Sequence, residues 1–253
     1  MSIRRLSILL AVSWCAWGSR AHGDEVLVAT ASNFISVAER LEVDFEAATG
    51  HDLLLVSGST GKLYAQIVSG APFEILLAAD QRRPERLVAD GRGVAASLRT
   101  YAVGRLVLWS PDPKRVASEG EQTLRGASFR RLALANPDLA PYGVAAREVL
   151  TALGLEGLLA NRLVMGENIG QAYALVATGN AELGLLAASQ QMRPGVSPSG
   201  SRWLVPADLH GPIRQDVVLL RHASQSVGAR AFLDYLSSSQ AKHIIRSFGY
   251  DVD

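Results

Sequence analysis

The chain has 253 residues, of which 48% are hydrophobic, 19% charged and 6% aromatic. This length and composition allow one large or two modest domains, and they exclude a disordered chain, a collagen-like repeat and a disulfide-stapled miniprotein. Lys and Arg total 25 against 24 Asp and Glu, so a net charge of +1 gives no basic surface for nucleic acid. No apolar run reaches the roughly 18–20 residues of a membrane-spanning helix.

The first 23 residues have the pattern of a secretory signal peptide. Two arginines precede an apolar stretch over residues 6–17, and small residues follow up to Gly23. We expect cleavage after Gly23, with a cut after Ala21 as the alternative. Removal of residues 1–23 takes away three arginines and no acid, so the net charge falls from +1 to −2. The only cysteine, Cys15, is lost with them, so we expect no disulfide and no cysteine-bound metal.

Beyond this segment, short apolar strands alternate with helical periods. Five apolar residues at helical spacing predict a helix over 34–45, which Gly50 would end. The stretch 193–212, rich in Pro, Gly and Ser, is predicted to be a surface excursion or a return crossing between lobes. The alternation predicts an α/β fold with mainly parallel sheets. The predicted strands are Val26–Thr30, Leu53–Ser57, Ile75–Ala79, Val103–Trp109, Leu132–Ala135, Arg162–Met165, Leu183–Ala187 and Asp216–Leu220.

Four turns rich in Ser, Thr, Asn, Gly or Pro follow predicted strands, at the edge where open α/β sheets bind ligands. Taken singly, each turn is more often an ordinary helix cap. Taken together, several helix N-termini offer N–H groups and partial positive charge that could converge on one anion. The four turns are Ala31–Phe34, Ser57–Lys62, Pro141–Gly143 and Gly166–Gly170.

Other chemistries find little support in the residues. The stretch Gly58–Lys62 lacks the spacer and the ending of a phosphate loop, and it holds no Gly-x-Ser-x-Gly elbow. Glu167 is better explained as a charge in the first turn of a helix than as a catalyst. We find no enzyme signature. The histidines after residue 23 have no metal-ligand spacing: His51, His210, His222 and His243.

Over essentially the whole chain after residue 23, the sequence resembles the periplasmic molybdate-binding proteins, the substrate-binding components of ABC transporters. The most specific motifs are Ser-Thr-Gly-Lys-Leu-Tyr-Ala-Gln-Ile at 59–67 and Pro-Tyr-Gly at 141–143. The other motifs that carry the resemblance are Ala29–Phe34, Gly70–Phe73, Ala78–Asp80, Ala135–Pro137, Ala140–Gly143, Gly166–Ile169 and Pro212–Asp216.

The resemblance implies a two-lobed periplasmic binding protein of type II. Each lobe is expected to be a mainly parallel sheet flanked by helices, with the ligand in the cleft between the lobes. The first lobe would take residues 24–102 and 213–253, and the second lobe residues 103–212. Two hinge crossings are then expected, near 101–103 and 212–214. The resemblance further implies a periplasmic monomer that delivers its ligand to an ABC permease in the inner membrane.

The resemblance also implies a set of ligand-binding residues and no cofactor. Some family members use a second-lobe tyrosine after the Gly-Leu-Leu strand, but this chain has Ala187 there. We therefore expect the phenol of Tyr142 to reach the same oxygen from a different turn. Ser32 and Thr60 would bind through hydroxyl and backbone N–H, Asn33 and Ser59 would be adjacent donors, and Tyr142 and Ile169 would act from the second lobe, Ile169 through its N–H.

These residue types suit a doubly charged oxyanion. Its oxygens only accept hydrogen bonds, so hydroxyls, amides and helix N-termini can bind it without lysine or arginine. The predicted function is capture of molybdate, and of tungstate also, with the metal bound only as oxyanion. Sulfate or thiosulfate is the first alternative ligand. An enzyme on the same scaffold is a second alternative, because two-lobed folds host other functions. The signal peptide and the charge of −2 argue against a DNA-binding regulator.

Overall fold

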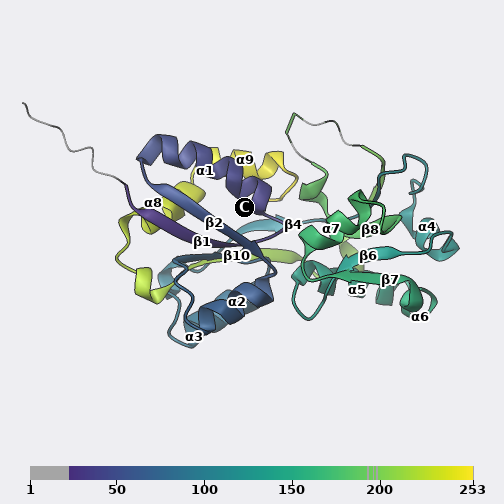
Figure 1. The fold of residues 1–253 in the computed structure, drawn as a ribbon, viewed down its shortest axis with the longest axis horizontal. Coiled ribbons are helices and arrows are strands. Elements are labelled where there is room, and N and C mark those ends of the chain that lie inside the picture. The colour runs from purple at the N-terminus through teal and green to yellow at the C-terminus, as the bar shows by residue number, and fades with distance from the viewer. Residues whose placement is uncertain (1–22, 193, 196, 198, 253) are drawn as a thin grey trace, which may run out of the picture.

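The computed structural model describes residues 23–192, 194–195, 197 and 199–252. The predicted signal peptide, except Gly23, lies outside the described residues. Two five-stranded sheets form two lobes that lie side by side along the long axis of the molecule (Figure 1). The first sheet has the strand order β2-β1-β3-β10-β4, and the second has the order β7-β6-β8-β5-β9.

The strands are β1 (Glu25–Ala31), β2 (Asp52–Gly58), β3 (Ile75–Leu77), β4 (Arg99–Gly104), β5 (Leu106–Ser110), β6 (Leu132–Ala135), β7 (Leu163–Gly166), β8 (Leu183–Ala187), β9 (Ser201–Leu204) and β10 (Ile213–Leu219). The α-helices are α1 (Ile35–Thr49), α2 (Thr60–Val68), α3 (Arg82–Ala89), α4 (Gly120–Gly126), α5 (Pro141–Ala152), α6 (Glu156–Leu159), α7 (Ile169–Ala177), α8 (Val227–Leu236) and α9 (Ser239–Ser247). Short 3₁₀ helices are η1 (Ala95–Ser97), η2 (Ala160–Arg162), η3 (Ala188–Gln190), η4 (Ala207–Leu209) and η5 (Arg221–Ala223).

Both sheets are mainly parallel, as the alternation of elements predicts. In the first sheet β1 pairs in parallel with β2 and β3, and β10 runs antiparallel between β3 and β4. In the second sheet β6 pairs in parallel with β7 and β8, and β5 runs antiparallel between β8 and β9. Four strands of each sheet therefore point the same way, and their carboxyl ends meet at one edge.

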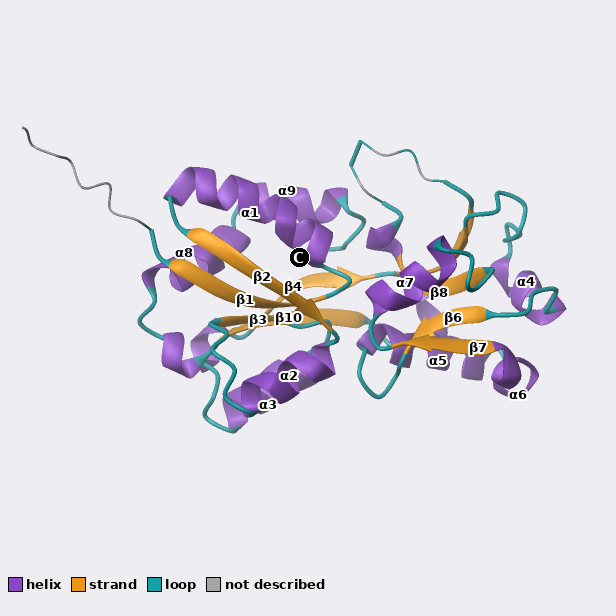
Figure 2. Cartoon of the chain, viewed as in Figure 1, coloured by secondary structure: helices purple, strands orange, loops and turns teal. Residues whose placement is uncertain are grey.

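Helices cover both faces of the first sheet (Figure 2). Successive strand residues face opposite sides, so Val28 packs with Phe45 of α1 and Phe232 of α8, whereas Ala29 packs with Leu63 of α2. The predicted helix over 34–45 is confirmed as α1, and it ends at Gly50 in the left-handed conformation with φ of 75°. In the part of the chain that the structure describes, no helix is long and apolar enough to cross a membrane.

One predicted strand is wrong, and the structure adds a strand to a predicted connection. The run Val103–Trp109 is not one strand, because its first two residues end β4 in the first sheet and the rest lies in β5 of the second sheet. The break falls at Arg105, whose guanidinium pairs with Asp251 at 2.5 Å and leaves the apolar layer. The stretch 193–212 is more than a loop, since it contains β9, which pairs with β5.

Candidate functional site

The four turns that the sequence singles out lie together where the two lobes meet. Within the first lobe, Ser32 donates its N–H to the carbonyl of Gly58 at 3.0 Å. Between the lobes, the N–H of Gly170 donates to the Ser32 hydroxyl at 3.3 Å, and the N–H of Gly61 donates to the carbonyl of Leu139 at 2.9 Å. Residues separated by 138 positions (Ser32 and Gly170) and by 78 positions (Gly61 and Leu139) therefore face each other across the cleft.

All six predicted site residues are buried. Their exposed fractions run from 1% for Thr60 and Tyr142 to 9% for Ser32. Polar side chains in that position need hydrogen-bond partners, because burying an unpaired polar group costs about 1–3 kcal/mol. The partners of each side chain therefore show what it can still offer to a ligand.

The turns are more than ordinary helix caps. Phe34 is the N-cap residue of α1 and makes no side-chain capping bond, so neither Ser32 nor Asn33 caps that helix. Ser59 does cap α2, where its hydroxyl accepts the N–H of Lys62 at 3.4 Å. Capping therefore accounts for Ser59 alone among the four polar residues predicted in the first lobe.

Each of the hydroxyls in these turns accepts a hydrogen bond through its oxygen, and its own hydrogen is not donated to any other group that the structure describes. Ser32 accepts the N–H of Gly170, Ser59 accepts its capping bond, and Thr60 accepts the N–H of Ala79 at 3.1 Å. Within the described residues, every hydrogen bond of these three side chains is accepted from an N–H. Each hydroxyl therefore keeps its hydrogen for an acceptor in the cleft.

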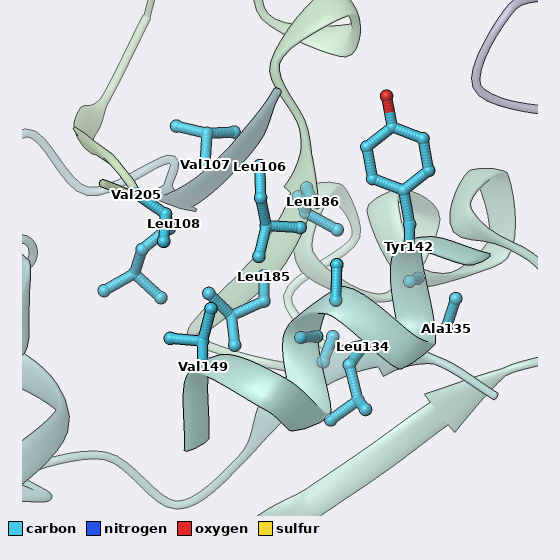
Figure 3. Packing of buried hydrophobic residues seen from close by; sticks show 14 of the residues in the cluster. Leu106, Val107, Leu108, Leu134, Ala135, Tyr142, Val149, Leu185, Leu186 and Val205 are labelled. Atoms are coloured by element: carbon cyan, nitrogen blue, oxygen red, sulfur yellow. The ribbon is translucent and has the colours of Figure 1, made fainter. Parts of the chain in front are cut away.

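Tyr142 lies in the first turn of α5 and its hydroxyl points away from the apolar cluster of the second lobe (Figure 3). The phenol oxygen accepts the side-chain N–H of Gln215 at 3.4 Å, and it also interacts with the hydroxyl of Tyr250. It lies close to Gly104 in β4, where an added Cβ would be 2.1 Å from the phenol oxygen. Burial raises the pKa of Tyr142 well above its ordinary value of 10.0, so the phenol stays protonated and can donate.

The side-chain amide nitrogen of Asn33 is fully engaged inside the protein. Its amide nitrogen donates to Gln215 at 2.8 Å and to the hydroxyl of Tyr250 at 2.9 Å, which uses both hydrogens. The backbone carbonyl of Asn33 accepts from the hydroxyl of Ser189 at 3.0 Å and from that of Tyr250 at 2.9 Å. A donation by Asn33 to a ligand would therefore use its backbone N–H.

Ile169 can offer only its backbone. Its side chain is 2% exposed and packs in the apolar cluster of the second lobe, and it is the first residue of α7. The preceding Asn168 caps the helix by accepting the N–H of Gln171 at 3.0 Å. The first N–H groups of a helix have no acceptor within the helix. The backbone N–H of Ile169, at the positive end of α7, is therefore able to donate to a ligand.

The segment after β8 contributes a hydroxyl that the sequence analysis misses. Ala187 ends β8, and Ser189 two residues later donates its hydroxyl hydrogen to the carbonyl of Asn33 in the first lobe. Ser189 also bonds the hydroxyl of Tyr250 at 3.0 Å. Gln215 and Tyr250 are likewise missed. The sequence signals for Gln215 are its place in the motif Pro212–Asp216 and a polar run, Arg-Gln-Asp, in a strand that is otherwise apolar.

The cations around these turns are paired with carboxylates. Lys62 forms an ion pair with Glu167 across the cleft at 2.9 Å, and this contact lowers the pKa of Glu167. Arg83 pairs with Asp80 and also donates to the carbonyl of Asp138 at 3.3 Å. Among the residues that the structure describes, no group of three or more His, Cys, Asp or Glu side chains could hold a metal ion. The cleft therefore suits an anion that needs neutral donors.

A cavity of about 650 Å³ opens beside the two crossings between the lobes and is separate from the four turns. Its walls come from the start of α3, from α5 and from the crossing that leads into β10, and they include Arg82, Glu148 and Pro212. None of the six predicted site residues lines it. The predicted site is thus the buried group of turns and not this cavity.

Comparison with known proteins agrees with this geometry. The family model described as bacterial extracellular solute-binding protein matches residues 26–251. The chain is 45% identical over 249 residues to the molybdate-binding protein ModA of Azotobacter vinelandii, covering 98% of each chain. It is 44% identical over 230 residues to ModA of Rhodobacter capsulatus, covering 91% of this chain and 89% of the relative.

A solved structure gives the same result for the fold. The periplasmic molybdate-binding protein of Azotobacter vinelandii superposes with a TM-score of 0.88 at 38% identity, covering 90% of this chain and 99% of that chain. The two-lobed α/β fold that the sequence predicts is thereby confirmed, as is the resemblance to periplasmic molybdate-binding proteins. The chain belongs to the family of bacterial extracellular solute-binding proteins.

Proposed function

We propose that this protein captures molybdate in the periplasm and delivers it to an ABC permease. The observation that carries the proposal is the orientation of the hydroxyls in the turns, which accept from N–H groups and keep their own hydrogens for the cleft. A dianion is the ligand that such a set of donors fits. The relatives that are named for molybdate binding support the choice of anion.

The proposed ligand residues are the six that the sequence indicates. Ser32, Ser59 and Thr60 donate from the first lobe, where Asn33 adds its backbone N–H. Tyr142 donates its phenol hydrogen and Ile169 its backbone N–H from the second lobe. Fixed dipoles bind the anion in place of charged side chains, so its release needs only the parting of the lobes.

The same donors govern selectivity. Hydrogenphosphate carries a proton that needs an acceptor, and in a site of donors it would lose affinity. Sulfate and thiosulfate are fully ionised, so only the size of the closed site can discriminate against them. Molybdate and tungstate are nearly equal in size, and we propose that both bind. The relatives' names describe binding proteins, which sets the enzyme alternative aside.

The lobes are proposed to move about the two crossings. We assign residues 24–102 and 213–253 to the first lobe and residues 103–212 to the second, except that Val103 and Gly104, which end β4, stay with the first lobe. We propose a signal peptide over residues 1–23. β4 and β10 pair side by side in the first sheet, and the chain enters the second lobe directly after β4 and returns directly before β10, which supports a hinge near these boundaries. Ligand would favour the closed population because it contacts both lobes. We propose that the protein acts as a monomer.

Isothermal titration calorimetry of the mature protein tests the function. We expect tight one-to-one binding of molybdate and of tungstate, with sulfate competing weakly. A protein that gives no heat with molybdate but binds sulfate or thiosulfate would support the alternative oxyanion. Absence of binding to every tetrahedral dianion would refute the proposal.

A further inference from the structure

A buried hydrogen-bonded cluster lies beneath the proposed anion site and connects elements that are far apart in the chain. Its central residue is Gln215 in β10, which has no exposed surface. The cluster continues through Asn33, Tyr101, Tyr142 and Tyr250, and all four are at most 5% exposed. A polar group of this size in the interior carries a cost, so its geometry calls for a functional explanation.

The two ends of the Gln215 amide have different partners. The oxygen accepts the amide N–H of Asn33 at 2.8 Å and the hydroxyl of Tyr101 at 3.2 Å. The nitrogen donates to the phenol oxygen of Tyr142 at 3.4 Å. One side chain in the hinge region is therefore bonded both to a proposed ligand residue of the first lobe and to a proposed ligand residue of the second.

The donation by Gln215 fixes the direction of the phenol. An amide N–H cannot accept, so the single hydrogen of Tyr142 has to point away from Gln215. The hydroxyl of Tyr250 donates to the backbone carbonyl of Asn33 at 2.9 Å, so its oxygen and the cleft are the two directions open to the phenol hydrogen of Tyr142. A bound dianion provides the strongest acceptor for the phenol hydrogen, because a hydrogen bond to a charged group is stronger than one between neutral groups.

We propose that Gln215 is a positioning residue, which aims the phenol hydrogen of Tyr142 at the bound oxyanion and ties that donor to Asn33. This inference rests on the proposed function, because it assumes that Tyr142 contacts the anion. It goes further in giving a role to a residue of the hinge strand that does not touch the ligand. Binding affinity then depends on Gln215 through Tyr142 and not through general stability.

A double-mutant cycle measures that dependence. Gln215→Leu, Tyr142→Phe and the double variant are titrated with molybdate by calorimetry. We expect Gln215→Leu to weaken binding about tenfold in the wild-type background and less than about twofold in the Tyr142→Phe background, since coupled residues are non-additive. Equal losses in both backgrounds would overturn the inference. Absence of molybdate binding by the wild-type protein would instead refute the proposed function, and the inference with it.

Gln215→Glu is a second variant that changes only one end of the side chain. It retains the oxygen that accepts from Asn33 and Tyr101, and it replaces the nitrogen with a group that donates only when protonated. The pKa of a buried carboxyl is raised, so it ionises within about pH 6 to pH 9. The titratable neighbours of Gln215 are the phenols of Tyr101, Tyr142 and Tyr250 and the carboxyl of Asp216.

We expect Gln215→Glu to bind molybdate with near wild-type affinity at the acidic end of this range and progressively more weakly as the pH rises. The wild-type affinity should stay flat over the same range. A variant with the pH profile of the wild type would contradict the inference. Ser97→Ala is the matched control, because the Ser97 hydroxyl accepts the N–H of Leu219 at 2.9 Å near the other end of β10. It should lower stability without changing affinity.

Discussion

Thr60→Val removes one hydroxyl from the start of α2 and keeps the shape of the side chain. Thr60 is 1% exposed, and its oxygen accepts the backbone N–H of Ala79 at 3.1 Å. The substitution therefore causes two separate losses. The proposed anion loses a donor, and the N–H of Ala79 loses its acceptor in a buried place.

Both losses have expected magnitudes. A hydrogen bond to a charged group contributes about 1.5–3 kcal/mol, which corresponds to molybdate binding about 10- to 150-fold weaker. The unpaired N–H of Ala79 should lower the free energy of unfolding by about 1–3 kcal/mol. Calorimetric titration measures the first effect, and urea unfolding without ligand measures the second.

Thr30→Val is the matched control for this prediction. Thr30 is also a fully buried threonine of the first lobe, but its hydroxyl has no hydrogen-bond partner among the residues that the structure describes. The same exchange should therefore change the affinity by less than about twofold and leave the stability unchanged or raised. If Thr60→Val lowers stability but binds molybdate like the wild type, the Thr60 hydroxyl serves the fold alone and the proposed donor set is wrong.

Three further predictions concern the phenol of Tyr142 and the ion pair between Lys62 and Glu167 across the cleft. Gly104→Ala would place a Cβ 2.1 Å from the phenol oxygen of Tyr142, so calorimetry should show molybdate affinity reduced about tenfold or more, since over-packing costs about 1–3 kcal/mol. Because burial raises the pKa of Tyr142, wild-type affinity should not change between about pH 6 and pH 9, and a fall within that range would contradict a neutral phenol donor. Lys62 lowers the pKa of Glu167 below its ordinary value of 4.5. Their ion pair therefore stabilises the closed form fully above pH 4.5, and this stabilisation is lost as the pH falls through the lowered pKa. Small-angle X-ray scattering should then show wild-type opening on acidification and a smaller response in Glu167→Gln.

The elements of the fold were predictable wherever the signal is local. The helical spacing that ends at Gly50 and the apolar runs of β1 and β6 depend only on neighbouring residues, and the structure has them where the pattern predicts. The boundary between β4 and β5 was not predictable in this way. Residues on both sides of Arg105 are equally apolar, and only their pairing with different strands separates them into two sheets.

The α/β class, the four turns and the residue types that suit an anion all follow from the order of residues along the chain. The tertiary structure alone decided what each of these residues can still offer. Asn33 uses both hydrogens of its side-chain amide within the protein, whereas Thr60 keeps its hydroxyl hydrogen free, although both are polar residues at the end of a strand. The difference lies in partners such as Gln215 and Ala79, which are distant along the chain and come close only when the sheets and lobes assemble. The spacing of residues along a sequence does not show whether a distant neighbour will act as hydrogen-bond donor or as acceptor.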